Sequence, residues 1–221
     1  MPTPLLRTVL PLITILLSLL LPGSATAGSY DDYFKAVRLD DPATIKELMQ
    51  RGLSPNMVEA DRNETAMIVA LREDSMKVFN LLLDTPGIDI NAQAANGDDA
   101  LMIASYKGNV VAVKALLAKD VEVNRPGWTP LHYAAASGNM EIVDLLLDAS
   151  AYIDAESPNG TTPLMMATRN GKDKTVELLL KEGADASLKN ALGMTAADFA
   201  EKFEFKGIAA ILLKHQQAFQ K

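Results

Sequence analysis

The sequence predicts an all-α solenoid of about six helix-turn-helix repeats, with β-hairpin-like fingers between successive repeats. Three observations support this prediction. A short motif returns at nearly constant spacing, an apolar block with helical spacing follows each copy, and the composition allows a packed core without cross-links. Hydrophobic residues make up 48% of the 221 residues and charged residues 22%, and cysteine is absent, which excludes disulfides and thiolate metal sites.

The first 27 residues are expected to be a cleavable signal peptide. Arg7 is their only charged residue, and an apolar run from Val9 to Leu21 follows it. This run has the length of the apolar part of a signal peptide, whereas a membrane-spanning helix takes about 20 residues. Ala25 and Ala27 form the small-residue pattern that signal peptidase accepts, so cleavage is predicted after Ala27. The alternative is an N-terminal anchor that is not cleaved.

Five copies of one motif follow, and each is expected to begin the first helix of a repeat. The copies are residues 63–70, 97–104, 127–134, 160–167 and 193–200, and their third positions lie 34, 30, 33 and 33 residues apart. In the clearest copies, Thr129 and Thr162 can cap the helix with a side-chain oxygen. Pro130 and Pro163 suit the first helical position, where the backbone N–H has no intrahelical partner.

An apolar block of the form Val/Ile-x-x-Leu-Leu follows each motif and is expected to bury a second helix. It occupies residues 78–82, 113–117, 142–146 and 176–180. A related block at 45–49 closes an earlier, degenerate repeat, and 208–213 closes the last one, so the chain holds six repeats. The junction at 123–129 is three residues shorter than the others, which predicts a blunted finger.

The motif Thr129–Ala134, with the sequence TPLHYA, resembles the ankyrin repeat in both its residues and its period. The resemblance implies the following units: a degenerate N-terminal capping repeat at 28–60, ankyrin repeats at 61–93, 94–125, 126–156 and 157–189, and a C-terminal capping repeat at 190–221. It also implies that His132 is a structural residue that ties the backbones of adjacent repeats together.

The charge of the chain limits the kinds of partner it can have. A formal net charge of -7 argues against nucleic acid, which needs clustered cations, and against an anionic membrane surface once the signal is removed. An acidic protein is steered toward a basic partner, although the charge can also simply maintain solubility. A protein partner therefore remains the expectation.

No residue set predicts catalysis, a metal site or a cofactor. The sequence lacks the motifs of common hydrolases, zinc peptidases and nucleotide-binding proteins. Asp40 and Asp41 precede Pro42 and suit a helix cap, and Asp98 and Asp99 lack the ligand spacing of a calcium loop. The alternative from another class is a hydrolase that uses these acidic clusters.

The resemblance implies that a partner binds the concave face, which is formed by the fingers and the first helices. Trp128, the single tryptophan, is the leading candidate because tryptophan is frequent at interface hot spots. The competing interpretation is that Trp128 packs over the shortened finger. The full set of candidate protein-binding residues is Trp128, Tyr106, Lys107, Arg72, Glu73, Arg169, Asn170, Asp98 and Thr161.

Together, these features predict a non-catalytic protein-binding module that is periplasmic or secreted. An ankyrin array without cysteine behind a signal peptide is expected to be bacterial, and the resemblance to known bacterial relatives suggests two versions: an inhibitor or immunity protein for a periplasmic or cell-wall enzyme, and an accessory protein that supports catalase and resistance to oxidative stress. A structural envelope protein without one dedicated partner is a third possibility. No residue selects among them.

Overall fold

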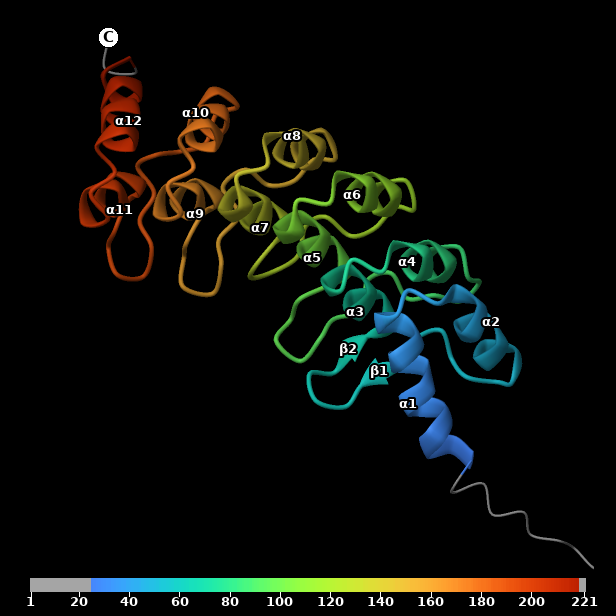
Figure 1. The fold of residues 1–221 in the computed structure, drawn as a ribbon. Coiled ribbons are helices and arrows are strands. Elements are labelled where there is room, and N and C mark those ends of the chain that lie inside the picture. Colours follow the sequence, from blue (N-terminus) through green and yellow to red (C-terminus); the bar gives the residue numbers. More distant parts are fainter. Residues whose placement is uncertain (1–24, 219–221) are drawn as a thin grey trace, which may run out of the picture.

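The computed structural model describes residues 25–218 and shows a solenoid of six helix pairs, which confirms the predicted fold class (Figure 1). The first helices of the pairs are α1 Ala25–Arg38, α3 Ala66–Arg72, α5 Ala100–Lys107, α7 Pro130–Ser137, α9 Pro163–Arg169 and α11 Ala196–Lys202. The second helices are α2 Pro42–Gln50, α4 Met76–Leu83, α6 Val110–Leu117, α8 Met140–Asp148, α10 Asp173–Lys181 and α12 Lys206–Ala218. Repeats 1 to 6 below are these pairs in chain order.

The helices form two layers. First helices pack on first helices, most extensively α5 on α7 and α7 on α9, and second helices form the outer row. The row of first helices bends so that the connecting fingers lie on the inside of the curve (Figure 1). Leu101, Leu131 and Leu164 occupy the same position in successive repeats and are fully buried between them. One apolar core therefore runs along the whole array, as stacking of repeats requires.

Each motif begins a first helix in the predicted way. The N-cap residues are Thr65, Asp99, Thr129, Thr162 and Thr195, all at the third position of the motif. The caps work through local hydrogen bonds: the Asp99 carboxylate accepts from the backbone N–H of Met102 at 2.8 Å, and the Thr162 hydroxyl oxygen accepts from that of Met165 at 3.3 Å. Because these bonds span three residues, the sequence could predict them.

The fingers vary in structure. Within the described residues one finger carries paired strands, β1 Val58–Glu59 and β2 Glu64–Thr65, which are antiparallel with Val58 opposite Thr65. The later fingers are loops with turns. The short junction has a bend at residues 126–128 in place of those turns. The hairpin-like description therefore applies fully to the first finger.

A ladder of side chains joins neighbouring fingers. Asn56 donates to the carbonyl of Gly87 and accepts from the backbone N–H of Asp89, both at 2.8 Å. Asn124 makes both kinds of bond in the same way, and Asn91 and Asp154 repeat the accepting bond. Each of these residues bonds the backbone of the following repeat, so the ladder fixes the spacing of the fingers.

The expected signal peptide lies largely outside the described residues, and the predicted cleavage point after Ala27 falls within the first turn of α1. None of the helices between residues 25 and 218 combines the length and the apolar character that crossing a bilayer requires.

Candidate docking face

One face of the first helices, on the side of the fingers, brings the sequence-predicted candidates together. It contains the residue before each N-cap and the fourth, seventh and eighth residues after it. Contacts between these positions show that they share a face. Arg72 pairs with Glu64 and Asp98, and Tyr106 meets Tyr133 edge-on with ring centres 6.2 Å apart. We call this surface of repeats 2 to 6 the docking face.

A polar cluster underlies the N-terminal half of the docking face. The Arg72 guanidinium lies 2.7 Å from the Glu64 carboxylate and 3.0 Å from that of Asp98. The Tyr133 hydroxyl donates to the other oxygen of Asp98, which is only 6% exposed. Burial, followed by the bond to Asp98, raises the pKa of Tyr133, so this side chain remains a neutral donor. The cluster links repeats 2, 3 and 4.

This cluster changes the role of two candidates. The carboxylate of Asp98 is already shared by Arg72, Tyr133 and the side-chain amide of Asn96. Arg72 is 30% exposed and both of its carboxylate partners are buried. These groups therefore hold the repeats together, which leaves them little capacity for a partner.

Trp128 lies over a rigid joint between repeats 4 and 5. The half-buried Trp128 ring meets the His132 ring edge-on, with centres 5.2 Å apart. His132 is fully buried: its Nδ1 accepts from the Thr129 backbone N–H at 3.1 Å, and its Nε2 donates to the Thr161 carbonyl at 2.8 Å. This is the tie between adjacent repeats that the family resemblance implies. Burial lowers the pKa of His132 to about 4, so the ring is neutral at pH 7.

Thr161 is buried, and its carbonyl is the acceptor for His132. The other candidates lie at the surface. Tyr106 is 59% exposed, and Arg169 and Glu73 are exposed as well. Lys107 reaches the Asp74 carboxylate at 2.9 Å, and the exposed Asn170 donates its amide to the Met166 carbonyl at 2.8 Å.

Arg125 has a structural role that the motif pattern did not reveal. Its side chain is 8% exposed and lies 3.4 Å from Asp99 and 2.9 Å from Glu122. Burial raises the pKa of Asp99, and both the N-cap bond to Met102 and the charge of Arg125 oppose that effect. The sequence signal for this burial is the junction beside Arg125, which is three residues shorter than the others, because a shortened finger can direct the Arg125 side chain inward.

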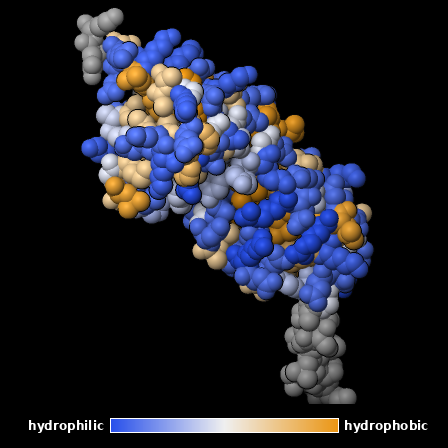
Figure 2. All heavy atoms as spheres, turned by 60° about the vertical axis from the view of Figure 1, so that its left-hand side comes forward, coloured by the Kyte–Doolittle hydropathy of each residue, from blue (hydrophilic) through white to orange (hydrophobic). Residues whose placement is uncertain are grey.

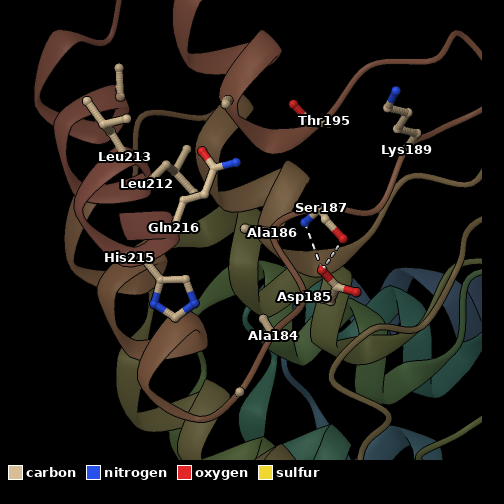
Figure 3. Close-up of a pocket in the computed structure, with 13 residues that line it drawn as sticks. Ala184, Asp185, Ala186, Ser187, Lys189, Thr195, Leu212, Leu213, His215 and Gln216 are labelled. Carbon is tan, nitrogen blue, oxygen red and sulfur yellow. Dashed lines mark hydrogen bonds between the residues drawn. The ribbon is translucent and has the colours of Figure 1, made fainter. Parts of the chain in front are cut away.

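A separate pocket of about 740 Å³ lies at the C-terminal end of the array, between α12 and the finger at residues 184–189 (Figure 3). Figure 2 shows apolar side chains gathered at this end of the molecule. Leu213, which lines the pocket, is 56% exposed. Asp185 accepts from both the N–H and the hydroxyl of Ser187, which lowers its pKa and commits it to the turn. The pocket is mostly apolar, and Lys189, Thr195, His215 and Gln216 also line it.

Within residues 25–218, no group of three or more His, Asp or Glu side chains is arranged to hold a metal ion. The carboxylates described above cap helices, accept hydrogen bonds within turns or pair with cations. The docking face can therefore provide binding through aromatic, aliphatic and cationic groups.

Comparisons with known proteins agree with this architecture. The family model described as ankyrin repeats (3 copies) matches residues 79–157 and 150–221. The human SH3 and multiple ankyrin repeat domains protein 2 is 33% identical over 174 residues, which is 76% of this chain and 9% of that protein. The human transient receptor potential cation channel subfamily A member 1 is 33% identical over 118 residues, 51% of this chain and 10% of that protein.

A mouse protein, the 2-5A-dependent ribonuclease, is 38% identical over 80 residues, which is 34% of this chain and 11% of that protein. The chain thus spans about a tenth of the length of each of these curated relatives.

Proposed function

Because the chain belongs to the ankyrin-repeat family, whose repeats serve as protein–protein interaction modules, we propose that it is an exported, non-catalytic binder of one partner protein. The partner contacts the docking face of repeats 3 to 6. No chemical step is assigned to the chain itself, which acts by occupying or holding a surface of its partner.

The observation that carries this proposal is an exposed aromatic surface on a rigid support. Tyr106 is 59% exposed although it contacts Tyr133, whose hydroxyl is fixed by Asp98. Trp128 stays half-buried above His132, which bonds two repeats. Rigid aromatic side chains bind with little loss of conformational entropy, and they are frequent among the residues that dominate binding energy.

Affinity capture tests the proposal. The full chain with a C-terminal tag is expressed in its own cells, and captured proteins are identified by mass spectrometry and mapped by cross-linking. We expect one stoichiometric partner cross-linked to repeats 3 to 6. In calorimetry, Trp128→Ala and Tyr106→Ala should each weaken binding by about 2 kcal/mol.

Val111→Ala is the control, because Val111 is 68% exposed and lies on α6 in the outer row of helices, away from the fingers and the docking face. Equal affinity of the Trp128 and Tyr106 variants and the parent would refute the assignment of this face. A capture without any stoichiometric partner would favour a structural envelope protein.

Export is tested on the same purified material. The pattern around Ala25 and Ala27 supports a mature chain that starts at Gly28, so intact mass and N-terminal sequencing should show the loss of residues 1–27. Retention of these residues would support an anchor. The identity of the captured protein then separates the two versions of the function: a lytic or toxic enzyme inhibited by the chain, or a catalase that depends on it.

A further inference from the structure

The edge of the docking face formed by the ends of the first helices is basic, although the whole chain carries a formal net charge of -7. We call this edge the helix-end wall and define it as residues 106–107, 136–137, 169–170 and 202–203, at the ends of α5, α7, α9 and α11. It contains Lys107, Arg169 and Lys202 and no acidic residue. The local charge is therefore opposite to the one that net charge alone suggests.

Repeat 2 does not extend this wall. Its equivalent residues are Arg72 and Glu73, and the Arg72 charge is already compensated by the buried Glu64 and Asp98 carboxylates. In contrast, Arg169 and Lys202 are exposed and have no salt bridge within the described part of the chain. Their charges are available to a partner.

Lys107 has two partners within the chain: the Arg72 carbonyl, which accepts from its ammonium at 3.0 Å, and one exposed carboxylate. Its ammonium lies 2.9 Å from the Asp74 carboxylate, which is 65% exposed. A surface pair of this kind contributes little free energy, so a ligand carboxylate can compete for Lys107. All three cations of the wall can therefore bind an anionic group.

The same wall presents aromatic rings at both of its ends. Tyr106 stands beside Lys107 in repeat 3, and Phe203, 40% exposed, stands beside Lys202 in repeat 6. Phe203 is held in place by parallel stacking on Phe199, with ring centres 6.4 Å apart. Between the two ends, repeat 4 has the small residues Ala136 and Ser137 where the others have a cation. A matching ligand must combine carboxylates with apolar side chains.

The spacing of the cations indicates the form of that ligand. Packed helices lie about 8–10 Å apart, and an extended chain in the polyproline II conformation advances about 3.1 Å per residue with three residues per turn, so one repeat corresponds to about three ligand residues and every third side chain faces the wall. Lys107 and Arg169 are two repeats apart, and Arg169 and Lys202 one repeat apart. Carboxylates about six and about three residues apart along an extended segment would therefore reach the three cations in turn.

We infer that the docking face binds an extended acidic segment of its partner protein, with carboxylates at about positions i, i+6 and i+9 and a larger apolar residue over Ala136. This inference rests on the proposed function, because it specifies the chemistry of the partner for that face. Side chains at the two ends of the segment contact Tyr106 and Phe203.

Selection from a library of random displayed peptides on the purified full chain tests the inference directly. The selected peptides should be enriched in Asp and Glu at the stated spacing. Their affinity, measured by fluorescence anisotropy, should fall as salt is raised, because the cations are exposed and screened by ions. A selection without binding peptides, or with peptides poor in acid, overturns the inference.

A charge-reversal variant provides the second arm. Lys107→Glu, Arg169→Glu and Lys202→Glu together should weaken binding of the selected peptides and of the captured partner at least about tenfold. The matched control reverses three exposed lysines of the outer row, Lys46→Glu, Lys174→Glu and Lys214→Glu, and changes the net charge equally. The control should retain the parent affinity, and circular dichroism should show that both variants are folded.

The two arms distinguish the failure of this inference from that of the proposed function. Binding that responds to Trp128→Ala and Tyr106→Ala but not to the reversed wall would refute the acidic segment alone. Binding that responds to none of these changes would refute the docking face itself. The single change Arg169→Gln, which is mild for an exposed residue, repeats the test should the triple variant not fold.

Discussion

Asp154→Asn is expected to stabilise the protein, because it gives the ladder between fingers a hydrogen-bond donor that Asp154 lacks. Asn124 uses both ends of its amide: it donates to the Ser150 carbonyl and accepts from the Tyr152 N–H, each at 2.8 Å. Asp154 occupies the same place one repeat later and accepts from the Asp185 N–H at 3.0 Å. An ionised carboxylate cannot donate, so the second bond of the rung is missing.

The magnitude follows from the missing bond and from burial. An asparagine at position 154 would supply an N–H for the Gly183 carbonyl, the equivalent of the carbonyl that Asn124 engages, and a net hydrogen bond contributes about 1 kcal/mol. Burial raises the pKa of Asp154, and the charge of Asp185 adds to this effect. Ionisation of Asp154 therefore destabilises the folded state, and Asp154→Asn removes that penalty as well.

The pH dependence has a definite sign. A carboxyl group whose folded-state pKa is raised costs no stability below its ordinary pKa, and the cost grows as the pH rises from that value to the folded-state pKa, above which it is complete. The gain from Asp154→Asn should be complete, at about 1 kcal/mol or more, near pH 7. It should shrink as the pH approaches 3.8, where a protonated Asp154 can itself donate.

Urea unfolding followed by circular dichroism at both pH values measures this gain, which corresponds to a rise in Tm of about 2–4 °C for a chain of this size. The reverse change, Asn124→Asp, is the matched control and should cost about 1–3 kcal/mol at pH 7 because it leaves the Ser150 carbonyl without its donor. The reasoning is wrong if Asp154→Asn leaves the free energy of unfolding unchanged at pH 7 while the control behaves as expected.

His132, Gly160 and Asp98 provide three further tests. Because the pKa of His132 is about 4 in the folded state against 6.5 ordinarily, the free energy of unfolding should fall by up to about 3 kcal/mol as the pH drops through that window, and His132→Gln should abolish this fall in urea titrations. Gly160→Ala places a Cβ 3.3 Å from the backbone of the next finger and should lower Tm more than Gly193→Ala, which has the same positive φ in open space; equal losses would contradict this. Asp98→Asn should cost about 1–3 kcal/mol in thermal melts, whereas an unchanged Tm would show that the cluster with Tyr133 contributes nothing.

The sequence was sufficient to predict the elements because their start signals are local. Each N-cap bond joins residues three positions apart, so a Thr or Asp at the third position of the motif determines where a helix begins. Asp99 illustrates this, since it lacks the hydroxyl and the following proline of the consensus and still caps α5. The number of repeats then followed from counting the six apolar blocks, since the first repeat lacks the motif.

The side chains of the docking face were harder to assign, because their roles depend on residues about 30 positions away. Asp98 and Thr161 stand at positions that suggest a partner contact, and each is buried by a residue of a neighbouring repeat. Arg125 is charged and sits in a loop, features of an exposed residue, yet it is buried against Asp99. The position of a residue in the motif predicts on which face of the repeat its side chain lies. Contacts with neighbouring repeats determine whether that side chain stays exposed.

This division predicts that stability and recognition are separable in this chain. Arg72 and Asp98 belong to the largely buried part of the docking face and hold three repeats in register, so changing them should lower Tm while a folded variant still binds. Tyr106 and Arg169 lie on top and contribute little to packing, so changing them should weaken binding at constant Tm. The buried cluster preorganises the face, and preorganisation reduces the entropy lost on binding. Variants of the cluster that remain folded should therefore affect affinity only to the extent that they loosen the position of Tyr133.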